Sequence, residues 1–141
     1  MSIRATVVRK GRKANVTDQY ATMIRRIIAK GTQDTMNTAK ESIQRHQSAG
    51  KTYTKYNPKR VHTASEAGNP PNSDTGYLAN NINMVLDNDG LGGSVESRAD
   101  YSAHLEFGTS KMAARPFMQP ALEENRPKIR AMFARLKARG N

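Results

Sequence analysis

The side chains with the most chemical potential in this sequence are three histidines and a few isolated acids. His46, His62 and His104 could each bind a metal ion, but no two of them stand at the spacing of paired metal ligands. Asp100 and Glu106 are close in sequence, yet nothing beside them marks an acid–base pair. The sequence therefore predicts no metal centre and no acid–base catalysis.

Signatures of nucleophilic and nucleotide chemistry are also missing. Ser73-Asp74 matches no nucleophile signature and is typical of a turn. The glycine-rich stretch 90–93 lacks the Lys-Ser/Thr pair of a phosphate-binding loop. We therefore predict that the protein is not an enzyme and uses no cofactor. Its function then depends on the shape and surface that its elements build.

The positive charge of the chain is concentrated at its two ends. The net charge is +11, and residues 14–125 carry equal numbers of acids and bases, so residues 1–13 and 126–141 hold the whole excess. Either these ends are simply solvated, or they contact an anionic surface, which could be acidic subunits or DNA. Our candidates for contact with partners or DNA are Arg126, Lys128, Arg130, Arg135, Lys137, Lys10, Arg12 and Lys13.

The composition limits the classes of protein to which the chain could belong. The 141 residues are enough for one domain with a modest core, and only 36% of them are hydrophobic. The absence of Cys excludes a disulfide framework and a Cys-based zinc site, and it fits a reducing compartment. No apolar run exceeds four residues, which predicts neither a signal peptide nor a membrane-spanning helix.

The N-terminal half is predicted to contain a strand, a long helix and a long loop. Residues 3–9 partly alternate and are β-branched, which favours a short strand within a basic arm, 1–16. Apolar residues at helical spacing predict a helix over 17–45, with a bend or a close contact at Gly31. Its apolar stripe weakens after Gly31, so we expect the second half to be exposed or packed outside its own core. The polar stretch 46–75 lacks periodicity and is expected to be a flexible loop, or an arm that orders on a neighbour.

The C-terminal half is predicted to contain a hairpin and two helices. Residues 80–88 place Ile82, Met84 and Leu86 on one face, and a glycine-rich turn leads to a second strand over 94–99, with Val95 inward. Residues 100–107 fit a helix or a strand, and we favour the helix. A basic helix follows over 119–139, kinked or restarted near Pro127. The fold class is α+β in a single domain, 1–141, with a long N-terminal and a C-terminal helix packed on a small antiparallel sheet.

The segment 101–120, which includes the first of these two helices and leads into the second, is expected to form a rigid corner. It is dense in aromatic, Pro and Gly residues, which specify shape rather than a reaction. An ion pair between Glu106 and Arg115 would hold its loop together. The residues of this corner are Tyr101, Leu105, Glu106, Phe107, Gly108, Arg115, Pro116, Phe117, Pro120 and Leu122.

A second stretch suggests a different function. Residues 51–60 interleave bases with Tyr53 and Tyr56, a pattern that could stack on nucleobases while the bases bind phosphate. Together with the charged ends, this stretch supports an alternative, a small basic DNA- or RNA-binding protein.

Three segments, in this order, resemble a known family. Asp74-Thr75-Gly76-Tyr77-Leu78 with Ile82 is similar to its "TG-x-L … I" turn and strand, and 101–109 to its "Y-x-A-x-x-L/V-E-F-G-T". Residues 115–122 resemble its "R/Q-P-F-L-x-P-A-L". The family is that of the tail-completion and head–tail joining (neck) proteins of long-tailed, lambda-like phages. The chain departs from the pattern at Asn80-Asn81, where a small hydroxyl residue is common.

The resemblance implies a structural virion protein. Such proteins are made in the host cytoplasm, act at the head-proximal end of the tail or in the neck, and form homo-oligomeric rings. The expected partners are copies of the chain, other tail or neck proteins and, through the channel, DNA, without a membrane. The resemblance implies no role for residues 46–75, because this segment varies among members of the family.

Overall fold

The computed structural model describes residues 3–8, 18–45, 52–56, 59–63, 65, 67–72 and 75–139. The elements in chain order are β1 (Ile3–Val8), α1 (Asp18–Arg45), β2 (Thr52–Tyr56), β3 (Lys59–Thr63), α2 (Tyr77–Asn80), β4 (Ile82–Leu86), β5 (Gly92–Ser97), α3 (Ser102–Phe107) and α4 (Met118–Arg139). None of the helices in this part of the chain combines the length and the apolar character that crossing a bilayer requires.

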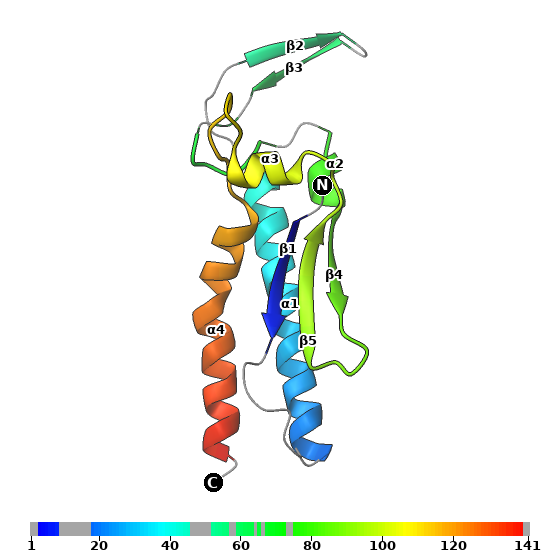
Figure 1. Ribbon diagram of the computed structural model, residues 1–141, viewed down its shortest axis with the longest axis vertical. Coiled ribbons are helices and arrows are strands. Elements are labelled where there is room, and N and C mark those ends of the chain that lie inside the picture. Colours follow the sequence, from blue (N-terminus) through cyan, green and yellow to red (C-terminus); the bar gives the residue numbers. More distant parts are fainter. Residues whose placement is uncertain are drawn as a thin grey trace.

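The chain has the α+β fold expected from its sequence. A three-stranded antiparallel sheet of order β1-β5-β4 packs on α1, and α4 runs antiparallel to α1 beside β1 (Figure 1). The predicted hairpin is confirmed, because β4 and β5 pair with Met84 opposite Val95. β1 pairs with the other side of β5, with Ala5 opposite Val95.

The core has two parts along the length of α1. The first joins the second half of α1 to the sheet and to the start of α4, with Ala39, Ile43, Ile82, Val95 and Phe117 buried. The second joins the first half of α1 to the rest of α4 and is described next. The expectation that the second half of α1 lies outside its own core is wrong. Thr35, Ala39 and Ile43 are almost inaccessible there, since small residues let the sheet approach the helix closely.

The second part of the core contains the close contact predicted at Gly31. Ile24, Ile28 and Ile129 form its buried centre. A Cβ atom on Gly31 would lie 2.8 Å from Cγ1 of Ile129, closer than carbon atoms pack, so only glycine lets α4 approach this far. On the neighbouring side of α1, a Cβ atom on Gly93 of β5 would collide with the hydroxyl of Thr32. That hydroxyl donates a 2.7 Å hydrogen bond to the Ile28 carbonyl.

The stretch 46–75 contains an element that sequence reasoning missed. β2 and β3 form a two-stranded antiparallel hairpin, separate from the main sheet, which projects beyond the end of the body occupied by α3 (Figure 1). The strands are short and rich in polar residues, so their pattern resembled that of a loop. Residues 46–51, 57–58, 64, 66 and 73–74 of this stretch lie outside the described residues.

The two remaining segments predicted to be helical are helices. Residues 102–107 form the helix α3, so the strand alternative for 100–107 is excluded. α4 spans Met118–Arg139 and continues through Pro127. Its first half packs into the first part of the core through Met118 and Ala121, and its second half into the second part.

Candidate functional site

The corner between α3 and α4 is organised by one carboxylate. Glu106 is buried, and its Oε2 accepts hydrogen bonds from the backbone N–H groups of Phe117 (2.8 Å) and Met118 (3.0 Å). Its Oε1 accepts a third, of 2.8 Å, from the N–H of Gln119. The first N–H groups of a helix have no partner inside the helix, and the helix dipole favours a negative charge there. Glu106 therefore acts as the N-terminal cap of α4 from the preceding helix.

The ion pair that we expected between Glu106 and Arg115 is absent among the described contacts of these two residues. Arg115 Nε instead donates a 3.0 Å hydrogen bond to the carbonyl of Ser65, and the Arg115 backbone N–H donates one of 2.6 Å to the carbonyl of Leu105. The Glu106 carboxylate bonds the N-terminus of α4, and the Arg115 side chain bonds Ser65, in a different segment. Arg115 thus links the corner to the chain that follows the β2–β3 hairpin.

The apolar residues of the predicted corner divide into a buried and an exposed group. Phe117 is fully buried, and Leu105, Pro116 and Leu122 are half-buried. Phe107, by contrast, is 75% exposed. Phe107 therefore contributes to the surface of the corner and not to its core.

Three further corner residues lie at turns or on the surface. Gly108 ends α3 at φ 75°, where an added Cβ atom would lie 2.8 Å from the Ala114 nitrogen. Pro120 is exposed in the first turn of α4, a position that tolerates proline. Tyr101 is 42% exposed, and its ring lies 6.2 Å from that of Tyr77, centroid to centroid. This contact joins two of the three segments that carry the family resemblance.

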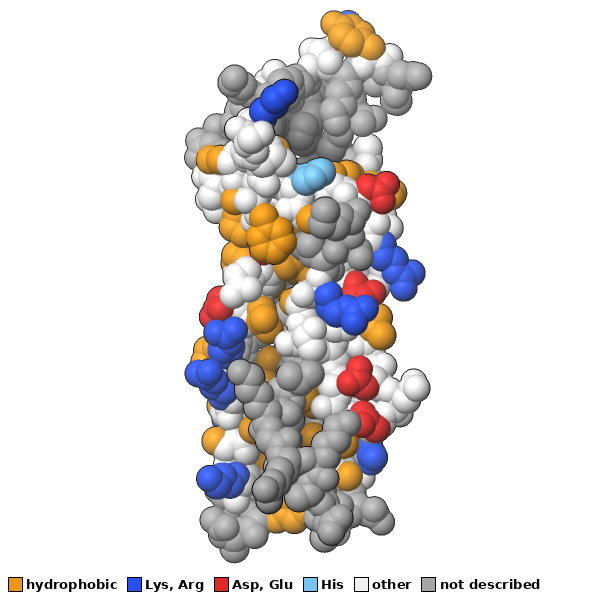
Figure 2. Space-filling model, in the orientation of Figure 1, with side chains coloured by type: hydrophobic (Ala, Val, Ile, Leu, Met, Phe, Trp, Pro, Cys, Tyr) orange, Lys and Arg blue, Asp and Glu red, His pale blue; other side chains and the backbone are white. Residues whose placement is uncertain are grey.

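The bases of α4 divide into two stripes. Arg126, Arg130 and Lys137 are four and seven residues apart and share one flank of the helix, and Lys128 and Arg135 share another. Only Arg126 of these five has a described ion pair, to Glu123 at 2.9 Å. Figure 2 shows Lys and Arg side chains along α4, across the molecule from the acidic side chains at the β4–β5 turn. The remaining candidates, Lys10, Arg12 and Lys13, lie outside the described residues.

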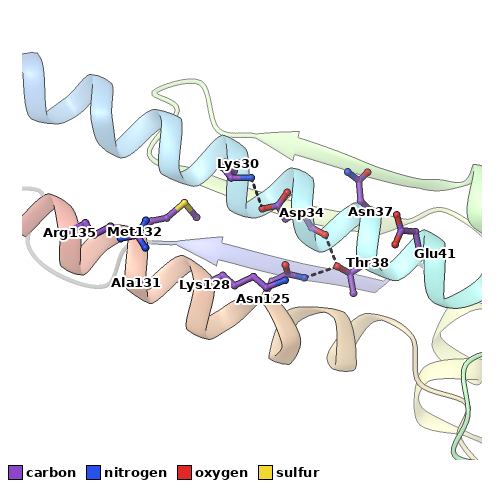
Figure 3. A pocket seen from close by; sticks show the side chains of 10 residues that line it. All are labelled: Lys30, Asp34, Asn37, Thr38, Glu41, Asn125, Lys128, Ala131, Met132 and Arg135. Atoms are coloured by element: carbon purple, nitrogen blue, oxygen red, sulfur yellow. Dashed lines mark hydrogen bonds and ion pairs between the residues drawn. The ribbon is translucent and has the colours of Figure 1, made fainter.

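The second stripe borders a polar groove between α1 and α4. The groove has a volume of about 600 Å³, and α1 and α4 line it together (Figure 3). Its lining residues are Lys30, Asp34, Asn37, Thr38, Glu41, Asn125, Lys128, Ala131, Met132 and Arg135. With charges of both signs, it offers ion pairs and hydrogen bonds to a polar partner.

A hydrogen-bond relay crosses the floor of this groove. Asn125 Nδ2 donates to Thr38 Oγ1 over 2.9 Å, and this hydroxyl donates to the Asp34 carbonyl over 2.9 Å. The Asp34 carboxylate pairs with Lys30 at 3.1 Å (Figure 3). Sequence reasoning missed Asn125, although a signal existed. Asn125 lies on the apolar stripe of α4, four residues before Ile129, where an amide must be buried and therefore bonded.

The described residues contain no group of three or more His, Cys, Asp or Glu side chains that could hold a metal ion. His104 is exposed on α3. His62 lies in β3 with its side chain outside the described set, and His46 is outside it altogether. Only His104 of the three histidines is therefore placed with its side chain, and it belongs to no such group among the described residues.

No protein-family model, no curated protein and no solved structure matches the chain.

Proposed function

We propose that the protein is a non-enzymatic assembly protein of a phage tail or head–tail junction, which acts as a subunit of a homo-oligomeric ring. One observation carries this proposal. The segments 101–109 and 115–122, which resemble the tail-completion family, form one structural unit in which Glu106 caps the helix that Phe117 anchors. The residues that carry the resemblance thus have a shared physical task, which is to fix the direction of α4.

The surface of that helix supports an assembly role. α4 leaves the corner with two stripes of bases, and four of its bases, Lys128, Arg130, Arg135 and Lys137, are exposed. Bases on a rigid helix suit contact with an acidic subunit or with DNA in a channel. Exposed Phe107, Tyr77 and Tyr101 add apolar surface at the end of the body where α2 and α3 lie (Figure 1), as expected of a protein that buries part of its surface in a larger assembly.

The test is electron microscopy of phage particles produced without the chain. Heads and tails should form and fail to join, or tails should be unfinished at their head-proximal end. Supplying the unmodified chain in trans should restore joined particles. Normal, infectious particles in its absence would refute the proposal.

One structural observation supports the alternative, a DNA- or RNA-binding protein. Tyr56 at the end of β2 is 78% exposed, and exposed Lys59 follows at the start of β3, so a stacking ring and a base lie close together on the hairpin. A salt titration of binding to generic duplex separates the two functions. Nucleic-acid binding predicts a steep loss of affinity, on the order of a thousandfold between 50 and 200 mM salt. Assembly predicts no binding at physiological salt and a ring by native mass measurement.

A further inference from the structure

Among the described residues, the β2–β3 hairpin has neither the third strand nor the packed helix that such elements need. Its strands have five residues each, and among the described elements neither packs extensively on anything except the other. An isolated two-stranded hairpin is at best marginally stable in water, and a third strand or a packed helix is what makes it stable. The hairpin therefore requires a further strand or helix beside it to be stable.

The main sheet offers an open edge at β4. In the order β1-β5-β4 both outer strands are edges, but α4 lies beside β1. On β4, the Asp87 N–H donates to the Gly92 carbonyl, and the Asn81 carbonyl accepts from the Arg98 N–H. Because bonding alternates along an antiparallel strand, residues 81, 83, 85 and 87 face β5. Residues 82, 84 and 86 then direct their N–H and C=O groups to the open edge.

Within the described part of the chain, this edge lacks the usual protection against pairing. Exposed edges are generally blunted by Lys, Pro or a bulge, whereas β4 contains no charge and no proline and keeps a regular register with β5. Val85 and Leu86 are 39% and 40% exposed at its end. β4 has five residues, the same length as β2 and β3.

The sequence charges of the two elements are complementary. Residues 51–63, which include the hairpin, carry four bases and no acid. Residues 81–91, which include β4 and its turn, carry the acids Asp87 and Asp89 and no base, and Arg25 of α1 lies beside Asp89, to whose carbonyl its Nε donates a 2.7 Å hydrogen bond. Opposite charges across adjacent strands favour pairing, and they favour this partner over a basic one.

We infer that the hairpin of one copy of this chain adds to the β4 edge of a second copy and extends its sheet. The contact is between copies, because within one molecule the hairpin projects from the end of the body, away from β4 (Figure 1). The hairpin (the donor) and the β4 edge (the acceptor) are different surfaces of the chain. A copy that uses one of them in a contact can therefore use the other in a further contact. Such a head-to-tail contact propagates until it closes as a ring. The inference rests on the proposed function only for the closure into a ring.

Two complementary defects test this contact. In the donor-defective variant a Gly-Ser linker replaces residues 52–63, and in the acceptor-defective variant Val85→Lys and Asp87→Lys add charge to the edge. The unmodified chain should be oligomeric by native mass measurement, and each variant alone should be monomeric. Mixed, they should form a 1:1 dimer and nothing larger, because only one intact contact remains. Glu124→Lys with Ala134→Lys, at two exposed positions on α4, adds the same charge as the matched control and should keep the oligomer.

A second measurement is independent of the deletion. Because the chain has no Cys, single substitutions report proximity directly. A mixture of Thr54→Cys and Leu86→Cys chains should form a disulfide between copies under mild oxidation. Gln33→Cys, exposed on α1, should not cross-link to either.

Several outcomes overturn the inference. These are a monomeric unmodified chain, an acceptor-defective variant that keeps the full oligomer, a mixture that stays monomeric, or cross-links no more frequent than those of Gln33→Cys. Particle assembly is a separate readout. Suppose that the chain forms oligomers that require the hairpin, but that phage particles made without the chain are normal. This result would refute the proposed function and would still support the contact between copies.

Discussion

The carboxylate of Glu106, near the end of α3, accepts a 2.8 Å hydrogen bond from the backbone N–H of Phe117, the residue before α4 begins. The contact spans eleven residues of sequence and fixes the angle at which the last helix leaves the body. Because the Phe117 side chain is fully buried beside it, polar and apolar constraints act on the same residue.

Loss of this cap should destabilise the protein. Glu106→Ala leaves three buried or half-buried N–H groups without their acceptor, and we expect the free energy of unfolding to fall by about 3 kcal/mol. Glu106→Gln keeps one acceptor oxygen and should lose less, about 1–2 kcal/mol. Urea unfolding measures both. Glu124→Ala, an exposed position on α4, is the control, and an equal loss there would contradict the capping role.

Phe117 and Phe107 form a matched pair for testing the corner. Phe117→Ala opens a cavity in the first part of the core and should cost about 3–5 kcal/mol, whereas Phe107→Ala should change stability by less than about 0.5 kcal/mol. Thermal or urea unfolding of the two variants gives the comparison. A loss below about 1 kcal/mol for Phe117→Ala would mean that the ring is not in the core.

Gly31→Ala should destabilise the chain even though alanine is the better helix former. The helix gains about 1 kcal/mol, but the new methyl group collides with Ile129, and such overpacking typically costs about 1–3 kcal/mol. A double-mutant cycle with Ile129→Ala isolates the collision. In the Ile129→Ala background the alanine should become neutral or stabilising, and strict additivity of the two changes would exclude the contact.

The stripe of Arg130 and Lys137 is predicted to act in assembly and not in folding. Replacing both by Ser should change the free energy of unfolding by less than about 0.5 kcal/mol and reduce oligomer formation or particle joining. Deleting 128–141 is a poorer experiment, because it also removes Ile129 from the second part of the core. Unchanged assembly by the Arg130→Ser, Lys137→Ser protein would show that this stripe is only solvated.

Periodicity in the sequence was sufficient for the elements that have a clear apolar face. The first half of α1, the β4–β5 hairpin and α4 each carry large aliphatic residues at regular spacing, and all three were predicted. The prediction for the second half of α1 was wrong because its buried residues include the small side chains of Thr35 and Ala39. A search for large apolar residues at helical spacing does not detect such positions.

The features that were missed depend on contacts between distant residues. Nothing near Glu106 in the sequence indicates that its carboxylate accepts N–H groups eleven to thirteen residues later. The β2–β3 hairpin was overlooked because its strands have no core to face, so no apolar alternation marks them. Such elements are determined by backbone pairing, which a pattern of side chains does not encode.

The neighbouring residues Gly31 and Thr32 have a mechanical consequence. On one side this turn of α1 meets Ile129 of α4, and on the other it meets Gly93 of β5. This turn of α1 therefore couples α4 to the sheet, in addition to the contacts that α4 makes with β1 and within the first part of the core. A load on the last helix is therefore shared between α1 and the sheet, and near Gly31 it passes through two adjacent small side chains.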